Sequence, residues 1–253
     1  MDKISISAVI ICLNEQTNIE RCLKSLKWVD EVVVYDSGST DETIDIARQM
    51  GARVVEGKWL GFGPTKNLAT SLAKNNWILS LDADEEVPDR LRDELIEVFH
   101  SLEISKAYSV PRLSYFMNRW VKHGGWYPDF QLRLFNKTYY QWNLQPIHEK
   151  IEAQNQMGLA SEKLKNHINH YVFKSIEHQI QTNNRYSSLQ AKKMFDEKKK
   201  FSYFHLFTKP YVKFVECYVF KLGFLDGWAG YVIARNAAYS VFMKWIKLKE
   251  LYD

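Results

Sequence analysis

Short β-branched apolar runs alternate with expected helices over the first third of the chain. The apolar runs are residues 4–12, 31–35, 52–55 and 77–81, and the helices are expected over about 14–26, 41–50 and 66–74. Apolar residues recur at helical spacing in the first helix, and the second has Thr40 or Asp41 as a cap and Gly51 at its end. Strands that are apolar nearly throughout and alternate with helices predict an α/β fold, with a doubly wound, mostly parallel sheet.

Polar clusters follow three of these expected strands, at the point where each strand ends. Asn14 and Glu15 follow the first strand, residues 36–41 (DSGSTD) follow the second, and residues 82–86 (DADEE) follow the fourth. Doubly wound sheets bind their ligands beyond the carboxyl ends of the strands. We therefore expect the three clusters to form one binding site.

Asp82 and Asp84 stand two residues apart at the end of an apolar strand. If strand alternation continues through them, both carboxylates point the same way and can bind one hard cation together with phosphate oxygens. The alternative is an acidic turn in solvent. A carboxylate against a buried strand end is costly unless a cation or hydrogen bonds offset it, which favours a site for a metal and a diphosphate.

The regular alternation ends near residue 105. Residues 105–151 combine short strands with loops and many aromatic side chains, which suits an acceptor-binding half. Helical periodicity dominates after about residue 153, where apolar stripes over 211–222 and 231–248 predict two amphipathic helices.

The last quarter of the chain is basic and aromatic. Residues 191–253 carry 12 Lys and Arg against 6 Asp and Glu, and 15 of the 36 aromatic residues lie from Phe201 onward. This combination indicates an anionic interface, and helical stripes of rings beside aliphatic residues favour a membrane surface over nucleic acid. The alternative is that the stripes cover the catalytic domain or a second subunit, as in a homodimer.

Cysteine usage and hydropathy indicate a cytoplasmic protein. Cys12, Cys22 and Cys217 are odd in number and have no metal-ligand spacing, as is typical of a reducing compartment. Neither a signal peptide nor about 18 consecutive apolar residues occurs, so no spanning helix is expected. We expect a soluble or peripheral protein.

Several motifs, in order along the chain, resemble the family-two inverting glycosyltransferases of the GT-A fold. They are residues 9–15 (VIICLNE), 34–41 (VYDSGSTD), 81–85 (LDADE), 125–135 (GWYPDFQLRLF) and 147–149 (IHE). The similarity covers about residues 4–150, and the most similar subgroup is the lipooligosaccharide-core β-1,4-glucosyltransferases. It implies a GT-A catalytic domain over 1–152, with a nucleotide-sugar half to about 104 and an acceptor half over 105–152. Residues 153–253 would form a helical, basic and aromatic C-terminal region.

The resemblance implies a UDP-sugar site. The donor-binding residues that it indicates are Leu13, Asn14, Glu15, Asp36, Lys66, Asp82 and Ala83. Asp36 would lie near the uracil; many relatives have a second Asp where this chain has Ser37, so the two positions are alternatives for the base contact. Lys66 would approach the diphosphate, unless it is a solvated lysine at a helix start.

A divalent metal, Mn²⁺ or Mg²⁺, is implied in the same site, since both suit oxygen ligands. Asp84 and Asp82 would coordinate it, and His148 would complete the metal site. His170 is a weaker alternative to His148, with His167 beside it on an expected helix.

An inverting transfer needs one carboxylate near the acceptor hydroxyl to remove its proton. Asp129 is the residue implied for this role, within the segment 125–135, and the alternative is a turn residue paired with Arg133. Weaker candidates for the base are Asp89, Glu85 and Glu86. Trp126, Tyr127 and Arg133 would bind the acceptor, although buried packing accounts equally well for the two rings.

The sequence thus predicts a metal-assisted, UDP-sugar-dependent glycosyltransferase that acts by single displacement. By its subgroup, the favoured donor is UDP-glucose and the favoured acceptor is an inner-core heptose of lipopolysaccharide, at the cytoplasmic face of the inner membrane. The alternatives are a transferase for another lipid-linked or capsular glycan and, in a different class, a nucleotide-binding or nucleic-acid-binding protein.

Overall fold

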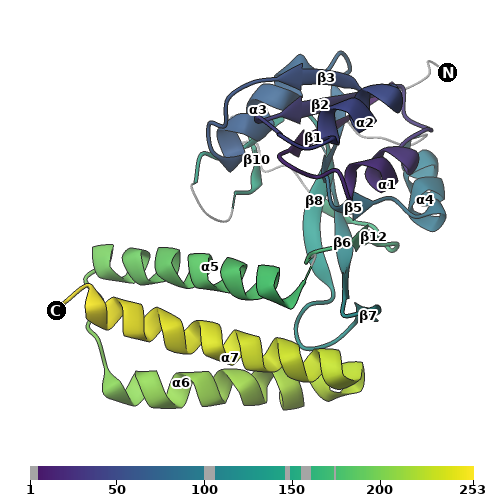
Figure 1. Cartoon of the computed structure of the whole chain (residues 1–253). Coiled ribbons are helices and arrows are strands. Elements are labelled where there is room, and N and C mark those ends of the chain that lie inside the picture. The colour runs from purple at the N-terminus through teal and green to yellow at the C-terminus, as the bar shows by residue number, and fades with distance from the viewer. Residues whose placement is uncertain (1–4, 100–105, 146–148, 155–160, 174) are drawn as a thin grey trace. The chain divides into compact units, whose positions relative to one another are not determined.

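The chain forms two compact units in a computed structural model that describes residues 5–99, 106–145, 149–154, 161–173 and 175–253 (Figure 1). The first, the sheet unit, comprises Met1–Arg112 and Asp129–His170. The second, the helical unit, comprises Leu113–Pro128 and Tyr171–Asp253. This division differs from the expected boundary after residue 152, because the chain leaves the sheet unit and returns to it before the final helices.

The sheet unit is built on a mixed sheet in the order β3-β2-β1-β4-β8-β6-β12-β5. The parallel strands are β3 (Arg53–Glu56), β2 (Glu31–Asp36), β1 (Ile6–Cys12) and β4 (Trp77–Asp82). The remaining strands of this order are β8 (Asp129–Asn136), β6 (Ala107–Phe116), β12 (Ile168–His170) and β5 (Glu85–Glu86). β8 runs antiparallel to both β4 and β6.

Both faces of the parallel strands are buried, which explains why the first strand is apolar nearly throughout. Alternate residues of β1 point to opposite faces: Ile6, Ala8 and Ile10 join one core cluster, and Val9 joins another. The first cluster includes residues of α1 (Ile19–Lys24), α2 (Thr43–Gln49) and α4 (Asp89–Phe99), and the second includes residues of α3 (Phe62–Leu72). Helices on both faces confirm the predicted doubly wound α/β fold.

The register of the parallel strands brings the predicted polar clusters together. Cys12 of β1 pairs with Asp36 of β2, and Ile11 pairs with Asp82 of β4. The three strands therefore end at the same edge of the sheet, and the loops that follow them share that edge.

The chain was expected to be helical after about residue 153, but the described residues of 153–170 form no helix. They include the end of β10 (Ile151–Ala153), then β11 (Ser161–Lys163) and β12. β10 pairs with β9 (Tyr140–Trp142), β11 pairs with β6, and β12 pairs with β5. His170 consequently lies on a strand opposite Glu85, where it could not be placed by helical periodicity.

The helical unit contains α5 (Ile176–Asp196), α6 (Tyr203–Val215) and α7 (Gly227–Glu250), with η1 (Glu216–Phe220) and η2 (Gly223–Asp226) between the last two. α7 packs against both α5 and α6. Ala191, Leu206 and Trp245 form the centre of this contact, one residue from each helix. Two apolar stripes near the predicted positions therefore do become amphipathic helices. Among the described residues, no helix combines the length and apolar character needed to cross a bilayer.

The last residues of β6, from Leu113, and the strand β7 (Arg119–Val121) that pairs with them belong to the helical unit. The buried carboxylate of Asp226 accepts hydrogen bonds from the backbone N–H groups of His123 (2.8 Å) and Lys122 (3.2 Å). Arg119 donates to the carbonyl oxygen of Asp226. These bonds fix the segment after β7 against the start of α7.

Candidate functional site

The loops after β1 and β2 are hydrogen-bonded to each other. Asn14 adopts a left-handed conformation (φ 57°), and its side-chain oxygen accepts from the N–H of Thr40 at 2.8 Å. Its own N–H donates to the Ser39 hydroxyl at 2.8 Å, and the N–H of Glu15 donates to the Thr43 hydroxyl at 2.8 Å. The loop that carries the half-exposed Leu13 is thereby held beside the second strand end.

Asp36 is buried, and its carboxylate bonds to its own loop. One oxygen accepts from the N–H groups of Gly38 (2.8 Å) and Ser39 (2.7 Å), and the other accepts from the Ser39 hydroxyl. Asp36 was expected near the uracil; in this structure its carboxylate shapes the turn, and its place near the base remains a prediction. The Ser37 hydroxyl, in contrast, is buried without a hydrogen-bond partner among the described residues, as is uncommon for a buried hydroxyl.

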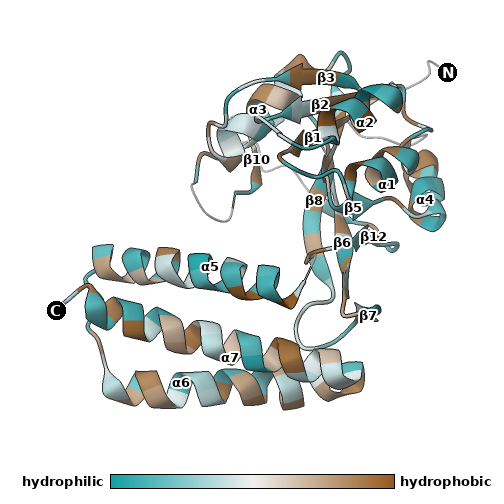
Figure 2. Ribbon diagram, viewed as in Figure 1, coloured by the Kyte–Doolittle hydropathy of each residue, from teal (hydrophilic) through white to brown (hydrophobic). Residues whose placement is uncertain are grey.

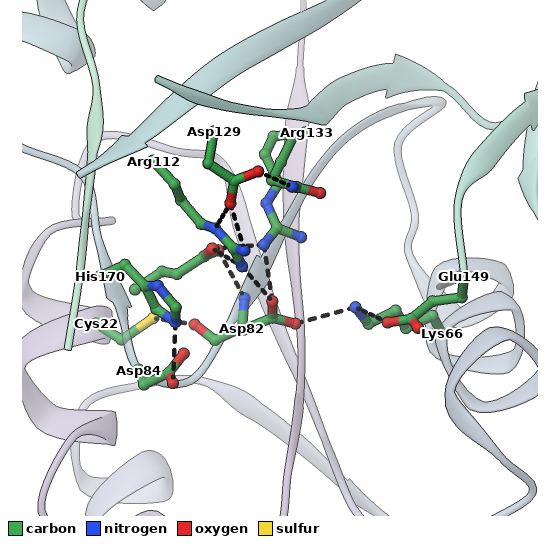
Figure 3. A network of polar contacts seen from close by, with 11 residues as sticks. Cys22, Lys66, Asp82, Asp84, Arg112, Asp129, Arg133, Glu149 and His170 are labelled. Atoms are coloured by element: carbon green, nitrogen blue, oxygen red, sulfur yellow. Dashed lines mark hydrogen bonds and ion pairs between the residues drawn. The ribbon is translucent and has the colours of Figure 1, made fainter. Parts of the chain in front are cut away.

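Lys66 lies on α3 and is 5% exposed, so the solvated alternative is wrong. Its ammonium group is 3.0 Å from Asp82 Oδ1 and 3.3 Å from Glu149 Oε1 (Figure 3). It also lies 4.3 Å from the centre of the Trp142 ring. The adjacent Asn67 holds α3 in place, because its side-chain amide exchanges two hydrogen bonds with the backbone of Trp142.

Arg133 was expected to bind the acceptor; in this structure it lies buried between carboxylates, and a contact with the acceptor remains a prediction. Its guanidinium group is buried and donates to Asp82 Oδ2 at 2.7 Å and to Glu85 Oε1 at 2.5 Å. The antiparallel register of β8 with β4 brings it to the end of β4. Burial opposes its charge, but the Glu85 and Asp82 carboxylates outweigh burial and raise the pKa of Arg133.

Asp82 consequently has a cationic partner for each oxygen, Lys66 for one and Arg133 for the other. Burial alone would raise the pKa of the Asp82 carboxyl group, but these charges and that of Arg112 lower it well below the usual value. Because the pKa of Asp82 is lower in the folded than in the unfolded protein, its ion pairs stabilise the folded state fully at pH values above the ordinary carboxyl pKa. This stabilisation is lost only as the pH falls through the folded value.

Asp129 begins β8 opposite Arg112 of β6. Its Oδ2 accepts from Arg112 Nε at 2.9 Å and from Nη2 at 2.6 Å, and its Oδ1 accepts from the Gln131 amide at 2.7 Å. The alternative, an ion pair between Asp129 and Arg133, is therefore wrong, because the partner of Asp129 is Arg112. The Asp129 side chain is 39% exposed, so its oriented carboxylate can still be reached from solvent.

Asp82 and Asp84 do not point the same way, contrary to the expectation from strand alternation. β4 ends at Asp82, and residues 83–84 form a turn that carries the Asp84 carboxylate to His170, with 3.4 Å between Oδ2 and Nε2 (Figure 3). Ala83 in this turn is buried. His148, expected in the metal site, lies outside the described residues.

The pair of Asp84 and His170 fits a divalent cation better than Asp82 does. Neighbouring ligands of an octahedral Mg²⁺ ion are about 3.0 Å apart at metal–ligand distances of about 2.1 Å, close to the separation observed here. Such ions keep several waters or substrate phosphates and need only one or two protein ligands. No group of three or more His, Cys, Asp or Glu with a metal-binding arrangement occurs in the part of the chain that the structure describes.

Trp126 and Tyr127 belong to the helical unit. The Trp126 ring packs 5.8 Å from that of Phe116 and 6.1 Å from that of Phe173, in a cluster with residues of α7. Packing accounts for Trp126 in this structure, and a contact of either ring with an acceptor sugar remains a prediction.

Two charged residues of this network, Arg112 and Glu149, received no role from the sequence, and Glu85 was only a weaker candidate for the base. Glu149 stands in the IHE motif beside the expected metal ligand, and Glu85 directly follows the DxD triplet. Arg112 interrupts an apolar strand, and an arginine at such a position needs a carboxylate partner. These signals indicate ion pairs without identifying the partners.

Known proteins resemble the chain over nearly all of its length. A glycosyltransferase of Rickettsia felis is 35% identical over 97% of this chain and 89% of its own length. The lipopolysaccharide core biosynthesis glycosyltransferase LpsC of Rhizobium meliloti is 27% identical over 97% of this chain and 92% of its own length.

Among solved structures, glucosyl-3-phosphoglycerate synthase from Mycobacterium tuberculosis in complex with Mn²⁺, UDP and glucosyl-3-phosphoglycerate is 27% identical, with a TM-score of 0.37. The similar region spans 45% of each of the two chains. The model of glycosyl transferase family 2 matches residues 7–157, which is more than half of the present chain. The chain therefore belongs to glycosyl transferase family 2 and is a glycosyltransferase.

Proposed function

We propose that this glycosyltransferase transfers glucose from UDP-glucose to a heptose hydroxyl in the inner core of lipopolysaccharide, with inversion at the anomeric carbon. The observation that carries the proposal is the charged network where β1, β2 and β4 end, in which buried Lys66 and Arg133 hold Asp82. The similarity to LpsC, whose name assigns it to lipopolysaccharide core biosynthesis, supports this class of acceptor.

The donor nucleotide would bind along the edge formed by the loops after β1 and β2. Leu13, Asn14 and Glu15 would line the pocket, and Asp36 or Ser37, where β2 ends, would lie near the base. Lys66 would face the diphosphate as a fixed positive charge, because Asn67 and the Trp142 ring hold its position.

The charge of the network supports a metal-dependent donor site. It contains three cationic side chains, Lys66, Arg112 and Arg133, and five carboxylates, Asp82, Asp84, Glu85, Asp129 and Glu149. Its net charge with neutral His170 is thus −2, and a diphosphate entering such a site would be repelled. Asp84 and His170 would hold the Mn²⁺ or Mg²⁺ ion, which when bound neutralises charge on the departing diphosphate.

Asp129 would act as the general base. Its carboxylate would take the proton of the acceptor hydroxyl as the hydroxyl oxygen bonds to the anomeric carbon and the bond from that carbon to UDP breaks. Arg112 and Gln131 fix the orientation of this carboxylate, which favours one position for the attacking oxygen.

Another lipid-linked or capsular glycan is the second candidate acceptor, and the network does not distinguish between them. A lipid-anchored acceptor of either kind would be met at the cytoplasmic face of the inner membrane. Binding to nucleic acid is disfavoured, because the negative edge of the sheet would repel a phosphate backbone.

A thermal-shift titration with UDP, with and without Mn²⁺, tests the donor site. We expect stabilisation by UDP that requires the metal. UDP release from a panel of UDP-sugars, with lipopolysaccharide cores truncated at successive sugars, then tests the donor and acceptor. The proposal fails if UDP and Mn²⁺ together leave the melting temperature unchanged, or if no core supports release.

A further inference from the structure

The exposed face of α6 is apolar and aromatic. Tyr203, Phe204, Phe207 and Tyr211 are each 61–73% exposed and recur at helical spacing, and Val212 at their edge is 56% exposed. Figure 2 shows hydrophobic residues along the length of this helix. Ser202 caps α6 by accepting from the N–H of His205, so the helix that presents these rings is well formed.

The face continues onto the start of α7. Trp228 is 67% exposed and stacks on Tyr231 at 5.3 Å between ring centres. Tyr231 in turn meets the edge of Phe214, near the end of α6, at 6.0 Å. These contacts join Trp228 to the rings of α6, so the exposed rings adjoin one another and are not scattered singly. We call it the aromatic face: Tyr203, Phe204, Phe207, Tyr211, Val212 and Trp228.

A group of lysines borders this face. On α6, Lys209 lies beside Val212 in a helical projection, and Lys213 follows it one turn later. Burial, and next the charges of Lys199, Lys213 and Lys209, lower the pKa of Lys244 on α7, so each of these three ammonium groups lies near enough to Lys244 to act on it. Glu216, at 3.1 Å from the Lys213 ammonium, offsets only one of these charges.

We propose that the aromatic face and these four lysines dock the enzyme on an anionic phospholipid surface. Rings inserted at headgroup level beside lysines that reach lipid phosphates are typical of interfacial helices. The lysines favour an acidic lipid surface over a second copy of the chain, because two copies of the same basic patch would repel each other. The inference builds on the proposed lipid-anchored acceptor, but it concerns a different unit from the charged network.

Co-sedimentation with phosphatidylcholine vesicles of graded phosphatidylglycerol content tests the proposal on the full chain. We expect binding to increase with phosphatidylglycerol and to weaken at high salt. Phe204→Ser with Phe207→Ser should lower binding by about tenfold or more at every anionic content. The matched apolar control is Ile176→Ser with Ile180→Ser, two half-exposed positions on α5, and it should bind like the parent.

Lys199→Gln with Lys209→Gln should lower affinity about fivefold per lysine and flatten the dependence on salt. Lys27→Gln with Lys74→Gln changes two exposed lysines of the sheet unit by the same charge, and it should leave binding unchanged. The proposal is overturned if the parent stays in the supernatant with every lipid mixture, or if the two control pairs lose binding as much as the docking pairs. Sedimentation as a dimer that Phe204→Ser with Phe207→Ser dissociates would also overturn it.

Turnover with a water-soluble core oligosaccharide separates this proposal from the proposed function. All the docking variants should retain parental turnover on that acceptor, because their substitutions lie outside the charged network. Normal turnover without vesicle binding would overturn the docking proposal alone. Vesicle binding without any turnover would overturn the proposed function and leave the docking proposal supported.

Discussion

Replacing Arg133 by methionine should destabilise the sheet unit, because it removes the positive charge between two carboxylates. Glu85 is fully buried, and its Oε1 lies 2.5 Å from Arg133. Breaking a buried ion pair by removing one partner costs about 3–5 kcal/mol, since a buried charge is left unpaired. Arg112 remains 3.5 Å from Glu85 and offsets part of this loss, so we expect a value near the lower end, about 3 kcal/mol.

For a unit of this size, that loss corresponds to a melting temperature lower by roughly 6–12 °C. Urea unfolding and thermal melts of Arg133→Met would measure it. Adding Glu85→Gln to Arg133→Met should restore part of the stability, because it removes the unpaired charge and keeps an acceptor oxygen for the N–H of Asp82. The control is Arg48→Met, which breaks an exposed pair with Glu56 and should cost less than about 1 kcal/mol.

An acceptor-binding arginine would behave differently. Its loss would leave unfolding unchanged and raise KM for the acceptor. Suppose that Arg133→Met unfolds like the parent and differs from it only in a higher KM for the acceptor. The sequence-based assignment is then correct, and the argument from the buried ion pair is wrong.

Three further substitutions test separate parts of the molecule. Asp84→Ala should abolish turnover and the metal-dependent thermal shift with UDP while leaving urea unfolding unchanged; an unfolded variant would instead assign Asp84 a structural role. Asp129→Asn should lower kcat about 10²-fold or more with UDP binding unchanged, and near-normal kcat would transfer the base to another carboxylate. Asp226→Ala should cost about 2–4 kcal/mol in urea unfolding, because the backbone N–H groups of Lys122 and His123 lose a charged acceptor, whereas Asp226→Asn keeps one acceptor oxygen and should lose less; equal losses would contradict this account.

Local patterns were sufficient to predict the parallel half of the sheet. Its strands are buried on both faces, so each appears as a short apolar run, and each run is separated from the next by a helix with its own periodicity or cap. Parallel strands must end at one edge, and the grouping of Asn14, Asp36 and Asp82 follows from the order of these elements alone. The fold and the meeting of these polar clusters at one edge of the sheet were therefore accessible from sequence.

The partners within the site were not accessible in this way, because they depend on antiparallel register between distant strands. Arg133 meets Glu85 across 48 residues, and it does so because β8 inserts between β4 and β6. His170 meets Asp84 because the three residues of β12 pair with β5, and a strand that short has too few positions to show alternation. Nothing in the sequence near either residue specifies these pairings.

The two aspartates of the DxD triplet differ because a strand end and a turn obey different geometry. Asp82 is the last residue of β4, so its side chain still follows the pleat and points to Lys66 on one side and Arg133 on the other. One turn residue later the chain has changed direction, and Asp84 points to His170 instead. A carboxylate already held by two cations has little to offer a metal ion, whereas one beside an imidazole has oxygens suited to it. The spacing of the triplet therefore separates Asp82, an internal counter-ion, from Asp84, and the metal site that we propose depends on Asp84 more than on Asp82.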